Sequence, residues 1–152
     1  MSPAKRGARG KKPAPSAKEF VVNIDGASRG NPGPASIGYV IATRDGAALR
    51  QEGRPIGEAT NNFAEYSALL AALADCETMG ADRIEVKSDS ELLVNQLNGI
   101  YKIKNENIKI LVALAREKLH GFSKVTFTHV PREKNREADR LAARALDGFP
   151  MF

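Results

Sequence analysis

The sequence predicts an α/β domain with a five-stranded mixed sheet, elements in the order βββαβααβα, and helices on both faces. Two apolar runs, at 20–24 and 35–43, and a third, less well patterned strand at about 49–56 are joined by short connections rich in Gly, Pro and Asp, which favours an antiparallel meander. Strand-like and helical patterns then alternate, as expected where helices pack on the faces of one sheet.

The first apolar run leads into Asp25 and a loop of Gly, Ser, Asn and Pro that extends to Pro34. Such a loop leaves backbone N–H groups accessible, so it can approach a phosphate or a sugar closely. Two interpretations of Asp25 stay open at this point. It is either a solvated acid in a turn, or one ligand of a metal site whose other ligands lie elsewhere in the chain.

The first helix is predicted over 63–79, with Asn or Thr residues of 60–62 as its cap and Gly80 after its end. This assignment puts Glu65 in the first turn, where a carboxylate also favours the helix dipole. The apolar side chains recur at helical spacing: Phe63, Tyr66, Leu70, Leu73 and Cys76.

A fourth strand is predicted at 83–88, followed by Asp89 and by Ser90 as the cap of a short helix, 91–97. A polar connection, 100–107, precedes a long amphipathic helix that ends near Gly121. The fifth strand covers 124–130, and the last helix starts near Asn135.

Composition divides the chain of 152 residues into two parts. Residues 1–18 hold six Lys or Arg and no acid, and their Pro, Gly, Ala and Ser content predicts a disordered basic tail. The net charge of +5 therefore describes the tail, because the remaining chain holds 17 basic and 18 acidic residues. Such a tail either binds polyanions weakly or only adds solubility. The folded domain is expected at 19–148.

No apolar run reaches membrane-spanning length, and no apolar signal core precedes the domain. The single cysteine, Cys76, rules out an internal disulfide and is expected in the core. These features predict a cytoplasmic protein without a membrane partner, and we expect it to be a monomer.

Four carboxylates have similar settings in different parts of the chain. Asp25 and Asp89 each follow a strand, whereas Glu65 and Asp139 each lie near the start of a helix. If the two strands are neighbours, all four acids meet at one edge of the sheet, where they would repel strongly without a cation. Oxygen ligands in this number suit Mg²⁺ or Mn²⁺. The alternative is that they are unrelated surface or helix-terminal acids.

Four motifs together resemble those of ribonuclease HI, over about residues 20–146 and in the order of that family. They are Asp25-Gly-Ala-Ser-Arg-Gly-Asn-Pro-Gly-Pro34, Thr60-Asn-Asn-Phe-Ala-Glu65, Ser88-Asp-Ser90 and Asn135-Arg-Glu-Ala-Asp139-Arg-Leu141. The resemblance implies the ribonuclease H fold. It also implies an endonuclease that cuts the RNA strand of RNA–DNA hybrids with two Mg²⁺ ions, leaving 5′-phosphate and 3′-hydroxyl ends.

The resemblance also implies residue roles. The metal-binding quartet of the family maps onto Asp25, Glu65, Asp89 and Asp139. Contacts to 2′-hydroxyls and base edges, together with one phosphate of the DNA strand, fall on the glycine loop and on the segment before Glu65. The implied substrate-binding residues are Gly26, Ala27, Ser28, Arg29, Gly30, Asn31, Thr60, Asn61, Asn62, Ser90, Glu91, Lys102 and Lys104. The Glu65 side chain is also expected to join the contacts to 2′-hydroxyls and base edges. Asn61 and Asn62 could also act as helix caps, and we expect a double role.

The sequence departs from better-known members of the ribonuclease HI family in three places. Many members carry glutamine where this chain has Glu91, whose charge suits a nucleic-acid groove poorly. A basic, Trp-bearing helix that grips hybrid in some members is missing, and Lys102, Lys104 and Lys109 are a thinner substitute. The short loop after Pro131 has no histidine and resembles that of the archaeal-type and related bacterial branch.

Many family members carry a histidine in this loop, near the attacked phosphate. Here Arg132 is expected to contact that phosphate, and His129 is expected to be an ordinary strand residue. Two rival functions share the fold: a nuclease with another substrate, such as a 3′–5′ exonuclease, and a catalytically silent module that binds hybrid or RNA. The intact glycine loop disfavours the first rival, and the four intact acids disfavour the second.

Overall fold

The computed structural model describes residues 18–148, so 1–17, almost all of the predicted tail, and 149–152 lie outside the described residues. Lys18, the last residue assigned to the tail, is held by the domain, since its backbone N–H donates to Asp82 at 2.7 Å. No helix of the described chain is long and apolar enough to span a membrane. The elements are β1 (Glu19–Ser28), β2 (Gly33–Thr43), β3 (Ala48–Ala59), α1 (Asn61–Thr78), β4 (Arg83–Ser88), α2 (Glu91–Leu97), α3 (Glu106–Leu119), β5 (Lys124–His129), the 3₁₀ turn η1 (Arg132–Lys134) and α4 (Arg136–Asp147).

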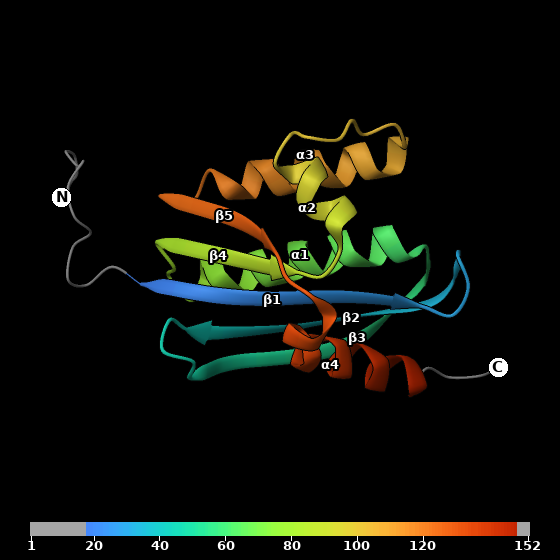
Figure 1. The fold of residues 1–152 in the computed structure, drawn as a ribbon, viewed down its shortest axis with the longest axis horizontal. Helices are drawn as coiled ribbons and strands as arrows, with labels where there is room; N and C mark the ends of the chain where they lie inside the picture. Colours follow the sequence, from blue (N-terminus) through green and yellow to red (C-terminus); the bar gives the residue numbers. More distant parts are fainter. Residues whose placement is uncertain (1–17, 149–152) are drawn as a thin grey trace.

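The sheet has the strand order β3-β2-β1-β4-β5, which places β1 at its centre (Figure 1). β1 pairs antiparallel with β2, and β2 pairs antiparallel with β3. β4 runs parallel to β1, and β5 runs parallel to β4. The predicted five-stranded mixed sheet, the order βββαβααβα and the pairing of the first and fourth strands are therefore confirmed.

Helices cover both faces of this sheet, as predicted (Figure 1). α1 packs on β1 and β2 on one face and has α3 beside it, while α4 packs on the other face of β1, β2 and β3. The main core lies between the sheet and α1, where Ile24, Tyr39 and Leu69 are completely buried. Cys76 belongs to this core as expected.

β1 extends further than the apolar run indicates. Residues 26–28 continue the strand because they pair with 35–37 of β2. Asp25 therefore lies inside β1, and the prediction that it ends the strand is wrong. On the other side of β1, however, the parallel pairing with β4 stops at Ile24 and Ser88. Asp25 and Asp89 thus follow the last paired residues side by side.

α1 begins earlier than predicted. The Thr60 side chain caps it by accepting the backbone N–H of Phe63 at 3.1 Å. Asn61 and Asn62 are therefore the first two helical residues and not caps. Glu65 consequently lies in the second turn, and its expected place in the first turn is wrong.

α4 approaches the sheet so closely that side chains are excluded beneath it. A Cβ atom on Gly38 of β2 would lie 2.4 Å from the Ala138 carbonyl oxygen, and one on Gly53 of β3 would lie 2.5 Å from that of Leu141. Ser36 of β2 adds a hydrogen bond from its hydroxyl to the carbonyl oxygen of Ala142 at 2.5 Å. Small residues on β2 and β3 thus set the short distance between α4 and the sheet.

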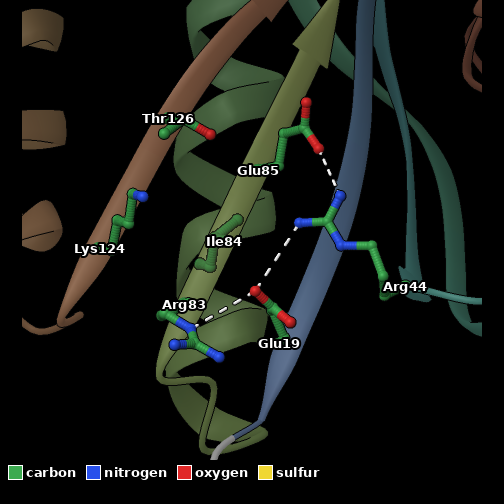
Figure 2. A pocket seen from close by; sticks show the side chains of 7 residues that line it. All are labelled: Glu19, Arg44, Arg83, Ile84, Glu85, Lys124 and Thr126. Carbon is green, nitrogen blue, oxygen red and sulfur yellow. Dashed lines mark hydrogen bonds and ion pairs between the residues drawn. The ribbon is translucent and has the colours of Figure 1, made fainter. Parts of the chain in front are cut away.

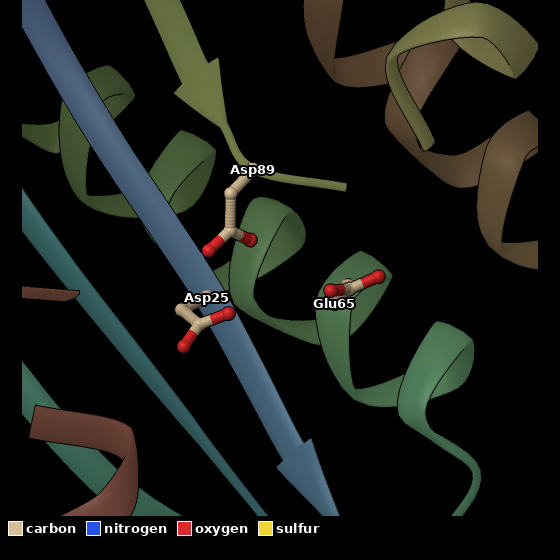
Figure 3. A group of neighbouring side chains, drawn as sticks. All are labelled: Asp25, Glu65 and Asp89. Atoms are coloured by element: carbon tan, nitrogen blue, oxygen red, sulfur yellow. The ribbon is translucent and has the colours of Figure 1, made fainter. Parts of the chain in front are cut away.

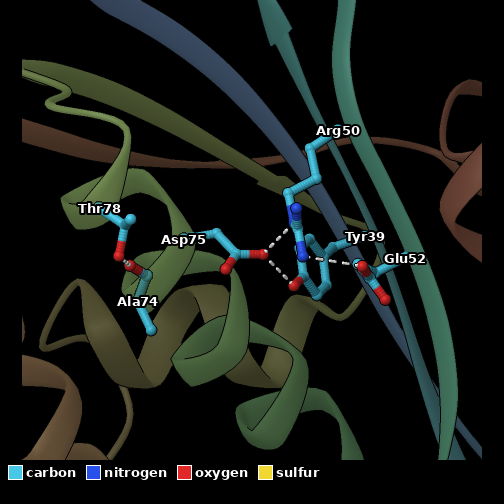
Figure 4. Close-up of polar contacts among 6 residues, drawn as sticks. All are labelled: Tyr39, Arg50, Glu52, Ala74, Asp75 and Thr78. Carbon is cyan, nitrogen blue, oxygen red and sulfur yellow. Dashed lines mark hydrogen bonds and ion pairs between the residues drawn. The ribbon is translucent and has the colours of Figure 1, made fainter.

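A polar network fastens the C-terminal half of α1 to β2 and β3 (Figure 4). The buried Tyr39 hydroxyl donates to Asp75, and Arg50 donates to the same carboxylate at 2.7 Å. Arg50 also bonds Glu52 at 2.9 Å. Burial, followed by the contact with Asp75, raises the pKa of Tyr39 to about 12, so its hydroxyl stays a donor.

A shallow pocket lies at the opposite end of the sheet from Asp25 and Asp89 (Figure 2). Its charged lining comprises Glu19, Arg44, Arg83, Glu85 and Lys124. Arg44 pairs with Glu85 at 2.6 Å, and Arg83 pairs with Glu19 at 3.5 Å. The side chains thus largely satisfy one another across β1, β2 and β4.

The substitution Gly38→Ala should destabilise the domain by about 1–3 kcal/mol, because the added methyl group must displace the backbone of α4. Denaturant unfolding measures this free energy. Gly148→Ala is the matched control, since a Cβ there meets its nearest atom, the Arg144 carbonyl oxygen, at an ordinary 3.6 Å. Equal stability of the two variants would contradict the close contact between β2 and α4.

Candidate active site

Three carboxylates converge at the centre of the sheet: Asp25 on β1, Glu65 on α1 and Asp89 directly after β4 (Figure 3). One oxygen atom of each lies within 4.8 Å of the others. Asp25 is buried, while Glu65 and Asp89 are partly exposed. The structure therefore brings together three of the four predicted metal ligands.

Gly26 allows α1 to reach Asp25. A Cβ atom on Gly26 would lie 2.4 Å from the backbone carbon of Ala64 and 2.4 Å from the backbone nitrogen of Glu65. Backbone of β1 and backbone of α1 are therefore in direct contact at this point. This contact carries Glu65 to Asp25 although the glutamate lies in the second turn of its helix.

Two serines fix the turn that carries Asp89. The Ser88 hydroxyl oxygen accepts the backbone N–H of Ser90 at 3.0 Å. Ser90 caps α2 as predicted, because its own hydroxyl oxygen accepts the N–H of Leu93 at 3.2 Å. The Ser90 side chain also lies close enough to Glu65 to oppose the rise in the pKa of that carboxyl group.

Asp139, the fourth predicted ligand, reaches the cluster from the first turn of α4. It lies outside the group of three, but its carboxyl group is close enough to contribute, after burial and Asp89, to the raised pKa of Asp25. The buried Asn135 positions it by donating to the Ile24 carbonyl oxygen at 2.9 Å and accepting from Asn23 at 2.9 Å.

Asn135 was not recognised as a positioning residue from the sequence. It occupies the N-cap position of α4, so its motif reads as a helix start, yet its side chain makes no capping bond. Its partners instead belong to β1, which no local pattern indicates. A buried polar side chain that joins two elements has no signal in a single sequence.

The electrostatics of the cluster follow from burial and from repulsion. Burial, followed by the charge of Asp89, raises the pKa of Asp25 to about 8. Burial raises the pKa of Glu65 to about 7, against the hydrogen bond from Ser90. Burial also raises the pKa of Asp89, although the nearby Arg132 opposes this. Without a cation, the site therefore retains protons near neutral pH.

The donor set fits a divalent cation with oxygen ligands. Ligand atoms around Mg²⁺ lie about 3–4 Å apart, because each bond is about 2.0–2.1 Å long. The carboxylate oxygens, all within 4.8 Å of one another, need only small side-chain movements to reach that spacing. A cation would also replace the protons that burial and repulsion retain on Asp25 and Glu65.

Arg132 lies at the rim of the cluster, as predicted. Its guanidinium is 3.5 Å from the Asp139 carboxylate, and its side chain is 78% exposed. His129 is the last residue of β5, pairs with Ser88 and is exposed, which confirms its assignment as a surface strand residue. Arg132 is therefore accessible to an incoming anion, although it pairs with Asp139.

The loop between β1 and β2 is tied to the start of α1. The Ser28 hydroxyl donates to the Ala59 carbonyl oxygen at 2.9 Å, and the Asn31 side-chain oxygen accepts the N–H of Asn61 at 2.9 Å. Arg29 pairs with Asp147 at the end of α4 at 2.8 Å. The residues predicted to bind substrate, Gly26–Asn31 and Thr60–Asn62, thus form one continuous surface beside the acids.

Other predicted substrate residues lie apart from the cluster. Glu91 is the exposed first residue of α2, and Lys102 and Lys104 are exposed in the connection before α3. Neither lysine forms an ion pair with the four acids within residues 18–148. Asn62, another predicted substrate residue, differs from these exposed side chains, because its side-chain oxygen is buried without a hydrogen-bond partner in the described part of the chain.

Comparisons with known proteins agree with this geometry. A family model described as "Reverse transcriptase-like" matches residues 23–145. A ribonuclease HI of Halobacterium salinarum is 48% identical over 82% of this chain, which spans 62% of the length of that relative.

Solved structures with the same fold cover most of the chain. The crystal structure of RNase H1 from Halobacterium salinarum is 45% identical, with a TM-score of 0.84, over 86% of this chain and 99% of that one. LC11-RNase H1 in complex with RNA/DNA hybrid is 42% identical, with a TM-score of 0.80, over 84% of this chain and 96% of that one. The N-terminal RNase H domain of a bifunctional Mycobacterium tuberculosis protein is 41% identical, with a TM-score of 0.84, over 86% of this chain and 95% of that one. The converging acids, the sheet topology and these likenesses agree, and the chain belongs to the ribonuclease H family.

Proposed function

We propose that this chain is an endonuclease that hydrolyses the RNA strand of RNA–DNA hybrids, with two Mg²⁺ ions as cofactors and Mn²⁺ as a substitute. The products would carry 5′-phosphate and 3′-hydroxyl ends. The convergence of Asp25, Glu65 and Asp89, with Asp139 close to Asp25, carries this proposal. The related LC11-RNase H1, which was solved with RNA/DNA hybrid, supports the choice of substrate.

The four carboxylates would hold the cations and keep them at the scissile phosphate. When bound, such ions supply an activated water and stabilise the leaving oxyanion in an in-line displacement at phosphorus. The protein's own contribution is orientation: Gly26 places Glu65, Ser90 caps the helix that follows Asp89, and Asn135 positions the helix of Asp139. Arg132 would contact the phosphate and offset its growing negative charge.

Selectivity for the RNA strand would come from the surface beside the acids. Only RNA carries 2′-hydroxyl groups, which both donate and accept hydrogen bonds. Backbone groups of 26–30 and the side chains of Asn31 and Asn61 are assigned to these hydroxyls and to base edges. Thr60 and Asn61, at the N-terminus of α1, are assigned to a phosphate of the DNA strand, which the helix dipole also favours.

One copy of the chain supplies all four acids, so we also propose that it works as a monomer, and in the cytoplasm. The single cysteine, Cys76, is buried, which suits a reducing compartment. Size-exclusion chromatography with light scattering tests the oligomeric state.

A cleavage assay with end-labelled RNA–DNA hybrid decides between the proposed activity and its rivals. Internal cuts in the RNA strand, with single-stranded RNA, double-stranded RNA and DNA left intact, are the expected result. Stepwise shortening from one end would favour an exonuclease of the same fold. Binding of hybrid without any cleavage in Mg²⁺ or Mn²⁺ would favour a silent binding module.

Each of Asp25→Asn, Glu65→Gln and Asp89→Asn should lower the cleavage rate by about 1000-fold or more, because stabilisation by cations is worth several kcal/mol. The fold should survive, since each change keeps the shape of the side chain and relieves repulsion. Glu117→Gln, an exposed acid on α3, serves as the control. A near wild-type rate in any of the three variants would show that the assigned metal ligands are wrong.

The stability of the metal-free protein should fall as the pH rises from about 4 to about 8. Asp25 ionises near its usual value of 3.8 when the chain is unfolded but only near 8 when it is folded. The folded state thus binds more protons in this window, and each rise in pH favours unfolding. Urea unfolding with a chelator measures the slope, which should be shallower for Asp25→Asn. Identical slopes for the two proteins would argue against the raised pKa.

Arg132→Ala should lower the catalytic rate by about 10- to 1000-fold, because it removes a donor to the phosphate. His129→Ala should change the rate little, since that side chain is exposed at the end of β5. Single-turnover rates on hybrid at saturating enzyme compare the two variants directly. If the histidine variant proved the more damaged, the assigned role of the loop after Pro131 would have to be abandoned.

A further inference from the structure

Arginines recur every fourth residue along the solvent side of α4. Arg136, Arg140 and Arg144 are all exposed, whereas Ala138, Ala142 and Leu146 of the same helix are buried. Four residues of a helix advance about 6 Å along its axis and little more than one turn around it. The three guanidinium groups therefore follow one line, which we call the arginine ridge (Arg136, Arg140 and Arg144).

Much of the charge on the arginine ridge is not neutralised. Arg140 bonds Glu137 through two contacts, of 2.8 and 3.1 Å. Arg136 and Arg144 form no ion pair with a carboxylate in the described part of the chain, residues 18–148. Local stability accounts for this arrangement only in part: Arg144 lies in the last turn, where a cation favours the helix dipole, whereas Arg136 at the first residue opposes that dipole.

The two ends of α4 both reach the proposed active site. Near its start, Arg132 lies 3.5 Å from the Asp139 carboxylate. At its last residue, Asp147 holds Arg29 of the β1–β2 loop at 2.8 Å. The arginine ridge thus extends, over about 12 Å from Arg136 to Arg144, between the acids and the loop assigned to substrate.

We propose that the arginine ridge binds phosphates of the hybrid outside the cleft and so extends the substrate surface along α4. This inference rests on the proposed function. Arginine suits the task, because its guanidinium can donate two parallel hydrogen bonds to one phosphate. A hybrid is favoured over another polyanion because the ridge starts beside the acids at which the scissile phosphate would be held.

Contacts of this kind add affinity without selecting a sequence, since every nucleotide carries a phosphate. They act on binding and not on the chemical step, because Arg136 and Arg144 lie on the side of α4 that faces solvent. The ridge would also supply part of the positive charge that a Trp-bearing basic helix provides in other family members and that this sequence lacks.

The test compares Arg136→Gln/Arg144→Gln with Lys118→Gln/Lys124→Gln, which also removes two positive charges. Both control residues lie far from the acids. Lys124 starts β5 beside the pocket in Figure 2, five residues from the end of the strand that pairs with Ser88. Lys118 lies near Gly121, close to Glu77 at the C-terminal end of α1. Glu65 lies near the other end of that helix.

Affinity for a labelled hybrid is measured by fluorescence anisotropy over a range of KCl concentrations, with Asp25→Asn added to every protein to prevent cleavage. The ridge variant should bind about tenfold more weakly, and its plot of log affinity against log salt should be shallower by about 1–2. In proteins with Asp25 intact, the ridge variant should have a raised KM and an unchanged kcat. The control variant should match the parent in all of these measurements.

Arg136→Lys/Arg144→Lys keeps the positive charge but loses the planar guanidinium groups. It should bind more weakly than the parent but more tightly than the Gln variant. Equal affinity and salt slope for the ridge and control variants would overturn the inference while leaving the proposed function intact. Failure of the parent protein to bind or cut hybrid would overturn both.

Discussion

The burial of carboxylates close to one another is the constraint on which this structure depends. Burial and the charge of Asp89 raise the pKa of Asp25 to about 8, and burial raises that of Glu65 to about 7. Such a cluster weakens the domain near neutral pH unless a cation occupies it. The rest of the fold must therefore hold the acids in place against a force that separates them.

Direct contact between backbones provides the necessary rigidity. Gly26 brings the backbone of α1 against β1, and Gly38 brings that of α4 against β2. Asn135 then joins α4 to the carbonyl group of Ile24, the residue before Asp25. Glu65 thus stands on a helix whose distance from β1 is set by backbone atoms. The helix of Asp139 is held by backbone contact with β2 and by the buried Asn135 side chain, so the geometry tolerates the repulsion.

The sequence allowed the fold and the acid quartet to be predicted, but not how the acids come together. Strand periodicity and turn residues identified all five strands, because they reflect local backbone preferences. The extension of β1 past Asp25 depends on pairing with β2, and the start of α1 depends on which residue caps it. The role of Asn135 depends on a partner more than 100 residues away, on β1. Contacts between distant segments leave no periodic pattern in one sequence.

The distribution of charge matters more for this protein than its sum. Outside residues 1–18, the chain holds 17 basic and 18 acidic residues, so its overall field would not attract a polyanion. Attraction must then come from local arrangement. Ion pairs such as Arg44 with Glu85 and Arg50 with Asp75 neutralise charges remote from the acids. Arg136 and Arg144, on the helix that carries Asp139, have no such partner among residues 18–148, and the same holds for exposed cations elsewhere, such as Lys102 and Lys104. A domain with almost no net charge can in this way present positive surface in places, one of which is the solvent side of α4.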